Sequence, residues 1–374
     1  MKKVRGINMF IQEQYLELAR KIHQENPVVD AHFDLAAEVY ERHLTGESGV
    51  VEQRYLPRFE EAGLNIVVSS IFINNRDLPE LGLRKALGQI TALKEDIEPV
   101  GDRIRVTKSR AELDENLAAG RISVLLSLEG LDPLGNDLSL LRTFYDLGVR
   151  GAGLTWSRRN AFATGCCTAG QFKEIPGGLT ELGKEAIRRM ERLGMWLDVS
   201  HLSNEGFRDV CDLAEQPFIA SHSDAWAVHE NYRNLTDDQI REIAGRGGVI
   251  GLNACGYLTG VMSEREKTER EGAAGAPEAA GQNADAALLR LCEHAEHLVR
   301  IADPEHVGYG FDLCKGLEET TPRIHFETEI YDVLAHHGEM VKLTAALLQR
   351  GMDEATAKGI AGGNFLRYYR RILK

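Results

Sequence analysis

The sequence lacks several features that mark common classes of protein. None of its six cysteines stands in a CxxC pair, which argues against a cysteine-rich zinc module, and we expect free thiols rather than disulfides. The opening MKKVRGINMFIQEQY is basic but holds no apolar run of signal length. No stretch approaches the roughly 20 apolar residues that a membrane span requires. These absences predict a cytoplasmic protein.

Positive charge is also in short supply. The chain has 44 Lys and Arg residues against 57 Asp and Glu residues, a formal net charge of -13. Nucleic acid and anionic membrane surfaces both attract basic patches, so neither is expected as a partner. With 374 residues, of which 43% are hydrophobic, the chain can bury a large core without disulfides.

Short apolar runs alternate along the chain with longer amphipathic stretches. Continuous apolar runs are typical of parallel strands buried on both faces. Eight such runs are candidate strands: residues 28–34, 65–73, 122–130, 151–157, 195–201, 218–223, 248–254 and 306–312.

Helical patterns separate the candidate strands. The clearest cover residues 180–194, 236–248 and 286–302, and in the second of these Thr236 is expected to cap the helix, with Gly245 or Gly247 ending it. Eight strand-helix units predict an α/β chain closed into a (β/α)8, TIM-like barrel. A doubly wound open sheet is the alternative, but no GxGxxG follows an early strand.

The domain organisation is expected to be simple, with one barrel domain over residues 1–374. The first 25 residues or so are expected to form a helix packed outside the barrel. Residues 258–285 break the pattern, because from Ser263 onward they are polar and rich in Ala, Gly and Glu. We expect a mobile insertion there, either a solvated loop or a lid over the substrate.

Metal-ligand residue types stand at the ends of five candidate strands. They are His32, Asp34, Glu129, His201, His222 and Asp312. In a barrel of this kind the active site lies at the carboxyl ends of the strands. His32 and Asp34 are two residues apart and can reach one metal together. Glu129 can bridge this metal and a second one, and His201 and His222 would complete the ligands of the second. Imidazole and carboxylate ligands suit zinc, and also manganese or cobalt.

Other histidines and cysteines invite the same question but lack the same pattern. His294 and His297 lie on a helical stretch in HAEH, one residue short of the HxxEH spacing, and are not expected to bind metal. His336 and His337, beside Gly338, are expected at the surface. The pair 166–167, both cysteines, is expected to pack within a loop.

Five short strings carry a resemblance to a known family. They are DAHFDL from Asp30, SLEG from Ser127, DVSH from Asp198, SHSDAWAVHENYRN from Ser221 and GGNFLR from Gly362. Each is weak alone, but their order and spacing resemble the renal or membrane dipeptidases, peptidase family M19, within the metal-dependent hydrolase superfamily.

The resemblance implies a role for each of these residues. His32 and Asp34 would hold the first of two zinc ions, Glu129 would bridge both, and His201 and His222 would hold the second. Arg233 would bind the carboxylate of the substrate, and Asp312 would move the proton. The implied activity is hydrolysis of dipeptides with a free C-terminal carboxylate, L-D dipeptides included. The family also implies a homodimer.

The chain departs from the family in two places. Trp156 stands where some members have a histidine that helps to bind the scissile carbonyl, and it is expected to line the substrate site. Cys314 and Lys315 stand where the family usually has a second aspartate and a glycine, which puts the substrate preference in question.

Two other functions compete with dipeptide hydrolysis. Lactonases, deaminases and phosphotriesterase-like enzymes of the same superfamily tend to open with HxH and often use a carboxylated lysine as bridge. This chain opens with His32 and Asp34 and supplies Glu129 instead. A binding scaffold without activity would not be expected to keep every metal-type residue.

Overall fold

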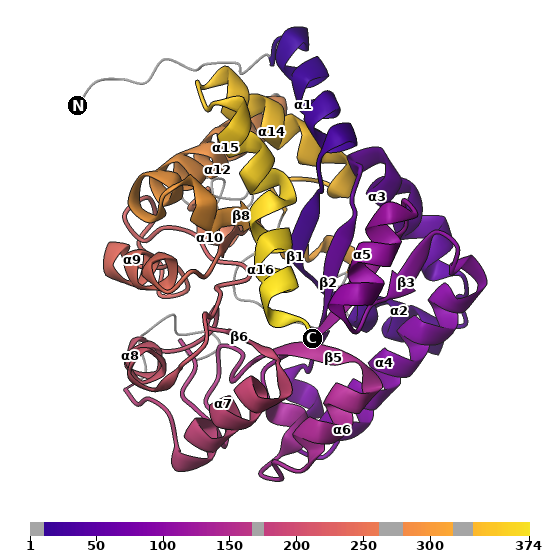
Figure 1. Ribbon diagram of the computed structural model, residues 1–374, viewed down its shortest axis with the longest axis vertical. Coiled ribbons are helices and arrows are strands. Elements are labelled where there is room, and N and C mark those ends of the chain that lie inside the picture. The colour runs from indigo at the N-terminus through magenta and orange to yellow at the C-terminus, as the bar shows by residue number, and fades with distance from the viewer. Residues whose placement is uncertain (1–10, 167–175, 262–279, 317–331) are drawn as a thin grey trace, which may run out of the picture.

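The computed structural model describes residues 11–166, 176–261, 280–316 and 332–374, and shows parallel strands surrounded by helices (Figure 1). The strands are β1 Val29–Phe33, β2 Ile66–Phe72, β3 Ile104–Val106, β4 Ile122–Glu129, β5 Val149–Gly153, β6 Trp196–Asp198, β7 Ile250–Leu252 and β8 Val307–Tyr309. Every residue of β2 and of β4 is buried, as expected for strands covered on both faces.

The strands form a TIM-like barrel, as the sequence predicts. Parallel pairing runs in the order β1-β2-β4-β5-β6, and a second parallel pair joins β7 to β8. Two isolated parallel bridges, Asp198 with Ile219 and Ala220 with Ile250, connect the two sheets. Strands thus follow one another around the barrel, and the doubly wound alternative is wrong.

Seven of the eight candidate strands form regular strands at the expected places. The sixth, residues 218–223, makes only the two bridges and is otherwise irregular. One short strand, β3, was not predicted, and it pairs with the first residues of β4.

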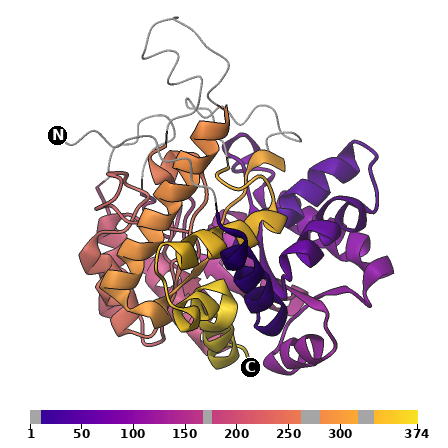
Figure 2. The same ribbon diagram turned by 90° about the horizontal axis from the view of Figure 1, so that it is seen from above.

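Helices cover the outside of the barrel (Figures 1 and 2). The α-helices are α1 Glu13–Glu25, α2 Leu35–Leu44, α3 Leu56–Ala62, α4 Gly82–Ile97, α5 Arg110–Ala118, α6 Leu140–Leu147, α7 Glu181–Leu193, α8 Asn204–Leu213, α9 Asp237–Gly245, α10 Gly256–Thr259, α12 Ala280–Ala302, α14 Met340–Gln349, α15 Glu354–Lys358 and α16 Asn364–Ile372. Short 3-10 turns are η2 Asn75–Asp77, η3 Glu98–Val100, η4 Asp132–Leu134, η5 Pro304–His306 and η6 His337–Glu339, and π-turns are η1 Val51–Tyr55 and η7 Gly359–Gly363.

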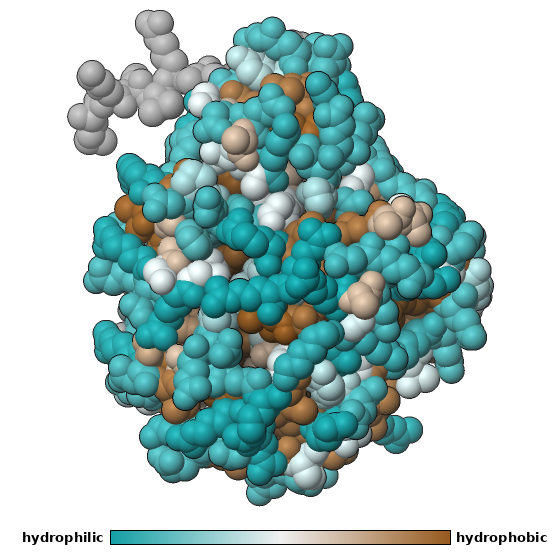
Figure 3. Space-filling model, in the orientation of Figure 1, coloured by the Kyte–Doolittle hydropathy of each residue, from teal (hydrophilic) through white to brown (hydrophobic). Residues whose placement is uncertain are grey.

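The face in Figure 3 is mainly hydrophilic, with scattered apolar residues.

The predicted helix signals act where expected. The Thr236 hydroxyl accepts the amide of Gln239, whose side chain accepts the amide of Thr236, so a capping box opens α9. The helix ends at Gly245, and Gly247 follows with φ +80°. At the start of helix α7, the Thr180 hydroxyl accepts the amide of Gly183.

Helix α16 closes the amino-terminal end of the barrel. Its Tyr369 ring lies 5.1 Å from that of Trp196, at the start of β6, and 5.7 Å from that of Phe365. The same apolar cluster includes residues at the starts of other strands: Val29, Ile66, Ile219 and Val249. Because this end is filled with apolar side chains, only the carboxyl ends of the strands are left for a polar site.

Two segments were expected to lie outside the barrel, the N-terminal helix and the insertion. Helix α1 packs outside the barrel against α14 (Figure 2). Most of the expected insertion, residues 262–279, lies outside the described residues, and residues 280–285 already belong to α12. Among the described residues, no helix is both long and apolar enough to span a bilayer.

The seam between β1 and β8 closes partly through a side chain. The amide of Asp312 donates to the carbonyl oxygen of His32 (3.0 Å), and the buried carboxylate of Asp30 accepts the amide of Phe311 (2.9 Å). The second oxygen of Asp30 lies 2.8 Å from Nε2 of His337, which is buried. The surface prediction for His337 is therefore wrong, because a partner 307 residues earlier in the chain holds it in the core.

Two glycines let the irregular sixth segment approach its neighbours. A Cβ atom on Gly251, in β7, would lie 1.8 Å from the carbonyl oxygen of Ser221, and one on Gly310, after β8, would lie 1.7 Å from it. Any side chain at either position would push the segment away. The segment carries His222, so these glycines help to place a predicted metal ligand.

We predict that Gly310→Ala lowers the free energy of unfolding by about 1–3 kcal/mol, the usual cost of overpacking a core. The measurement is urea unfolding followed by circular dichroism. Gly245→Ala is the matched control, because a Cβ there meets no atom within 4 Å. A Gly310→Ala variant as stable as the wild type would show that the barrel accommodates the methyl group.

Candidate metal centre

The five predicted metal ligands meet at the carboxyl end of the barrel. They are His32 and Asp34 at the end of β1, Glu129 as the last residue of β4, His201 after β6, and His222 in the sixth segment. All five are buried. Three groups have ligand atoms within 4.8 Å of one another, and two of them consist of predicted ligands alone: His32, Asp34 and Glu129, and Glu129, His201 and His222. The third group joins His32 and His222 to Asp198.

Glu129 is common to both groups. Its Oε1 lies 2.9 Å from Nε2 of His201 and 3.6 Å from Nε2 of His222. Its Oε2 lies 3.7 Å from Nε2 of His32. The two oxygens therefore face different histidines, which is the arrangement that a bridging carboxylate needs.

Burial sets the protonation of this cluster. It raises the pKa of Asp34 to about 6, and together with the charges of Asp34 and Asp312 it holds the pKa of Glu129 well above its usual value. Burial lowers the pKa of His32 to about 3, and that of the other two histidines well below the usual value. Neutral imidazole is the form that ligates a metal, and a nearby cation favours the charged form of each carboxyl group.

The orientation of the imidazoles fits a metal. Nε2 of His32 is buried without a hydrogen-bond partner, which is costly for a polar atom. The Nε2 atoms of His201 and His222 face each other at 2.9 Å. Three imidazole nitrogens directed into a space that also holds the oxygens of Asp34 and Glu129 form a donor set suited to zinc.

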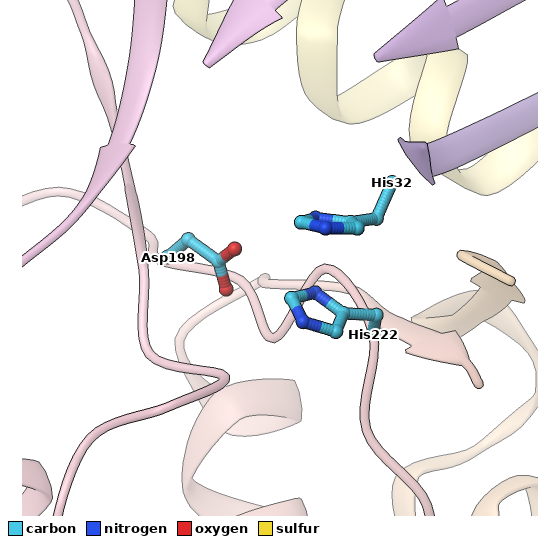
Figure 4. Close-up of side chains that lie close together, drawn as sticks. All are labelled: His32, Asp198 and His222. Carbon is cyan, nitrogen blue, oxygen red and sulfur yellow. The ribbon is translucent and has the colours of Figure 1, made fainter. Parts of the chain in front are cut away.

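Asp198, the last residue of β6, was not predicted as part of the site. Its carboxylate lies near the rings of His32 and His222, which are 3.6 Å apart (Figure 4). The carboxylate accepts the hydroxyl and the amide of Ser221 and those of Ser200. Its position at a strand end, like that of Glu129, is the signal that could have found it.

The Ser221 hydroxyl fixes the protonation of His222. Its oxygen lies 2.7 Å from Nδ1 of His222, and its single hydrogen is donated to Asp198. It must therefore accept the Nδ1–H of His222, which leaves the lone pair on Nε2, the atom that faces the cluster. Asp198 thus acts on His222 through a hydroxyl, in the manner of the outer-shell carboxylates of metal sites.

Arg233 brings a fixed positive charge to the edge of the cluster. Its buried guanidinium donates to Nδ1 of His201 (3.1 Å), to the hydroxyl of Ser223 (2.8 Å) and to the carbonyl of His222 (2.8 Å). A guanidinium has five N–H groups. Two of them, one on each terminal nitrogen, are left for another acceptor.

Asp312 lies three residues after the end of β8. Its backbone adopts φ +54°, a left-handed conformation that is unusual for a residue other than glycine. Its Oδ1 lies 3.8 Å from Nε2 of His32, and its Oδ2 accepts the side-chain amide of Asn253 at 3.1 Å. Burial raises the pKa of Asp312 to about 7, a value suited to a group that takes and returns a proton.

Trp156 forms an apolar wall beside the cluster. Its ring lies 5.9 Å from that of His201 and 5.4 Å from that of Phe72. The guanidinium carbon of Arg158 lies 5.3 Å from the centre of the indole. The structure thus places Trp156 next to a predicted ligand.

Arg158 ties three loops together behind this wall. It donates to the carboxylate of Asp132 (3.1 Å), to the side-chain oxygen of Asn75 (3.0 Å) and to the carbonyl of Ile73 (2.9 Å). These partners follow β4 and β2, while Arg158 itself follows β5. One guanidinium therefore cross-links three neighbouring parts of the rim.

The other residues singled out in the sequence have structural contacts. Cys166 is buried, with Sγ 3.7 Å from the Ser157 hydroxyl, while Cys167 lies outside the described residues. His294 is buried, and its ring nitrogens contact the amide of Ala225 and the carbonyl of Thr259. The amides of Cys314 and Lys315 both donate to the carboxylate of Asp332, each at 3.0 Å.

Comparison with known proteins gives consistent matches over nearly the whole chain. A family model described as membrane dipeptidase (peptidase family M19) matches residues 16–373. Dipeptidase aclJ of Aspergillus oryzae is 27% identical over 366 residues, an alignment that covers 91% of this chain and 77% of the relative.

Two solved structures show the same architecture. A structure described as dipeptidase AC, a metallopeptidase of family M19, is 26% identical with a TM-score of 0.74, covering 93% of this chain and 99% of that one. A metallopeptidase from Rhodobacter sphaeroides, liganded with a phosphinate mimic of the dipeptide L-Ala-D-Ala, is 25% identical with a TM-score of 0.73 and the same coverage of both chains.

We predict that metal binding releases protons and strengthens with pH. Because the pKa values of Asp34 and Glu129 are raised in the protein without metal, both retain protons in mildly acidic solution that a cation must displace. The affinity for zinc should therefore rise from about pH 5 to about pH 8. Calorimetric titrations in two buffers of different ionisation enthalpy measure the protons released.

Glu129→Gln is the control for this titration. The amide cannot titrate or bridge, so the variant should release fewer protons and bind less metal. Heats that do not depend on the buffer, with an affinity that is flat in pH, would contradict the proton coupling.

Proposed function

The chain belongs to the membrane dipeptidase family, peptidase family M19, and on this premise we propose that it hydrolyses dipeptides at a centre of two zinc ions. The family makes it a metal-dependent hydrolase. The observation that carries the proposal is Glu129, whose two oxygens face His32 on one side and the remaining two histidines on the other. This is the arrangement that a pair of cations sharing one carboxylate requires.

The chain's own residues would divide between the two ions. His32 and Asp34 would hold one, His201 and His222 the other, and Glu129 both. Zinc is the first choice for this mixed nitrogen and oxygen donor set, with manganese or cobalt as substitutes. When bound, such a pair supplies Lewis acidity that activates a water molecule and polarises a carbonyl group.

Arg233 would bind the C-terminal carboxylate of the substrate. It keeps two N–H groups, and a guanidinium presents them in a plane that matches a carboxylate. The contact of its Nε with Nδ1 of His201 can also be released, because the Ser157 hydroxyl lies 2.9 Å from the same nitrogen and can accept a hydrogen bond from a protonated Nδ1. A metal at Nε2 of His201 requires that proton on Nδ1, so metal binding would free Arg233 for the substrate.

Asp312 would carry the proton of the reaction. A group of pKa near 7 can accept a proton from the attacking water and return it to the departing amine. Its side chain is 18% exposed, so a substrate in the mouth of the barrel could reach it.

Trp156 would set part of the substrate preference. The chain supplies an indole where a second carbonyl-binding group is found in some relatives, so polarisation of the carbonyl would fall to the metal centre. The solved relative with a mimic of L-Ala-D-Ala supports the proposal that L-D dipeptides are substrates. The cytoplasmic location and the homodimer stay predictions from the sequence.

The function is tested with zinc-loaded protein and a panel of L-L and L-D dipeptides. We expect hydrolysis of at least some dipeptides, loss of activity with a chelator, recovery with zinc, and about two metal ions per chain by elemental analysis. Lactones and aminated nucleosides serve as the competing substrates. Protein that holds two metals and cleaves no dipeptide, but does act on one of these, would overturn the proposal.

We predict that Arg233→Ala raises KM for dipeptides by about tenfold or more, because a charge-assisted hydrogen bond contributes roughly 1.5–3 kcal/mol. A dipeptide amide, which lacks the carboxylate, should be a poor substrate of the wild type and little affected by the substitution. Steady-state kinetics on the acid and the amide provide the comparison. Equal rates of the wild type on both substrates would remove Arg233 from carboxylate recognition.

A further inference from the structure

Asn253 contacts Asp312 from the strand next to it. It follows β7 directly and is fully buried, although no resemblance or motif singles it out. Its Nδ2 donates to Oδ2 of Asp312 at 3.1 Å. Its Oδ1 accepts the backbone amide of Cys255 at 2.6 Å, and its backbone amide donates to Oδ1 of Asp224 at 3.2 Å.

These contacts fix which end of the Asn253 amide faces Asp312. The backbone N–H of Cys255 can only donate, so the atom that faces it must be the side-chain oxygen. The NH2 group is then the atom directed at Asp312. A flip of the amide would lose both hydrogen bonds, because it would place two donors together at one end and two acceptors together at the other.

The consequence for Asp312 concerns the position of a proton. An NH2 group donates and cannot accept, so a proton on Oδ2 of Asp312 would find no acceptor in Asn253 and would weaken Oδ2 as the acceptor of the Asn253 hydrogen bond. A proton carried by Asp312 is therefore held on Oδ1. This is the oxygen that lies 3.8 Å from Nε2 of His32 and faces the cluster.

The backbone of Asp312 is held in place. Its amide is held by the carbonyl of His32 at 3.0 Å, and its backbone is in the left-handed region. The Cys314 thiol also donates to its carbonyl oxygen at 3.0 Å. With the backbone fixed, the rotation of the carboxylate depends on the hydrogen bond of Oδ2 with Asn253 at 3.1 Å, while Oδ1 has only the longer contact with the Cys314 sulfur at 3.6 Å.

We propose that Asn253 is a positioning residue that holds Oδ2 of Asp312 and thereby assigns the shuttled proton to Oδ1. The inference rests on the proposed dipeptidase function. One O–H bond of the attacking water breaks as an O–H bond forms on Oδ1. That bond then breaks as an N–H bond forms on the leaving amine, so no proton is gained or lost.

The first test is the pair Asn253→Asp and Asn253→Ala in zinc-loaded protein. Asn253→Asp keeps the shape but removes the donor, and Asn253→Ala removes the donor without adding charge. Each should lower kcat by about 10–100-fold, the usual cost of removing an outer partner of a catalytic group, with little change in KM. Metal content should stay at the wild-type level. Asn116→Asp is the matched control, since this buried asparagine donates to hydroxyls beside β3 and should keep kcat within about twofold.

The second test shows whether Asn253 acts through Asp312. Asp312→Asn alone should lower kcat strongly, because an amide cannot carry the proton. If Asn253 acts through Asp312, adding Asn253→Ala to that variant should cost little more, whereas independent roles would multiply the two losses. Three results would overturn the proposal. They are wild-type kcat in both Asn253 variants, multiplied losses in the double variant, or loss of metal in both Asn253→Asp and Asn253→Ala. Failure of the wild type to cleave any dipeptide would instead reject the proposed function.

Discussion

Carboxylates buried beside one another are stable only when positive charge accompanies them. Burial raises the pKa of Asp34, of Glu129 and of Asp312, and the charge of Asp34 raises the pKa of the other two carboxyl groups further. Arg233 supplies one fixed positive charge. The remaining positive charge must come from protons or from metal cations. The neutral histidines around the carboxylates can bind metal cations. The closed amino-terminal end, the glycines at the sixth segment and the strand-end positions of the ligands all serve to keep this cluster together.

Much of the barrel could be predicted from the sequence because its strands are buried on both faces. Strand β4 is apolar over nearly its full length and ends in Glu129, so its limits are plain in the sequence. Strand β3 was missed because it has only three residues, and Arg105 interrupts its apolar pattern. The sixth segment looks like a strand but is held by a carbonyl between two glycines, a contact that residue types do not reveal.

The sequence predicts the candidate ligands of the site but not the partners that hold them. The five ligand candidates and Arg233 could be selected by residue type and by their place at the ends of strands or in a quoted string. The partners of these residues could not. The Ser221 hydroxyl donates to Asp198, and Asn253 directs its NH2 group at Asp312, and each of these pairs joins residues that are far apart in the chain. His337 was misplaced for the same reason, since its partner Asp30 lies at the other end of the sequence.

The Arg158 cross-link has a consequence for how the mouth of the barrel selects its contents. One guanidinium spans Asp132, Asn75 and Ile73 while lying over Trp156, so the indole is backed by three loops at once. Moving that wall would break several hydrogen bonds together, at roughly 1 kcal/mol or more each. In the proposed function, this side of the mouth would act as a rigid template that accepts or rejects a substrate side chain by its shape, rather than as a surface that changes its shape with each substrate. Discrimination here would be steric, and set before any chemistry begins.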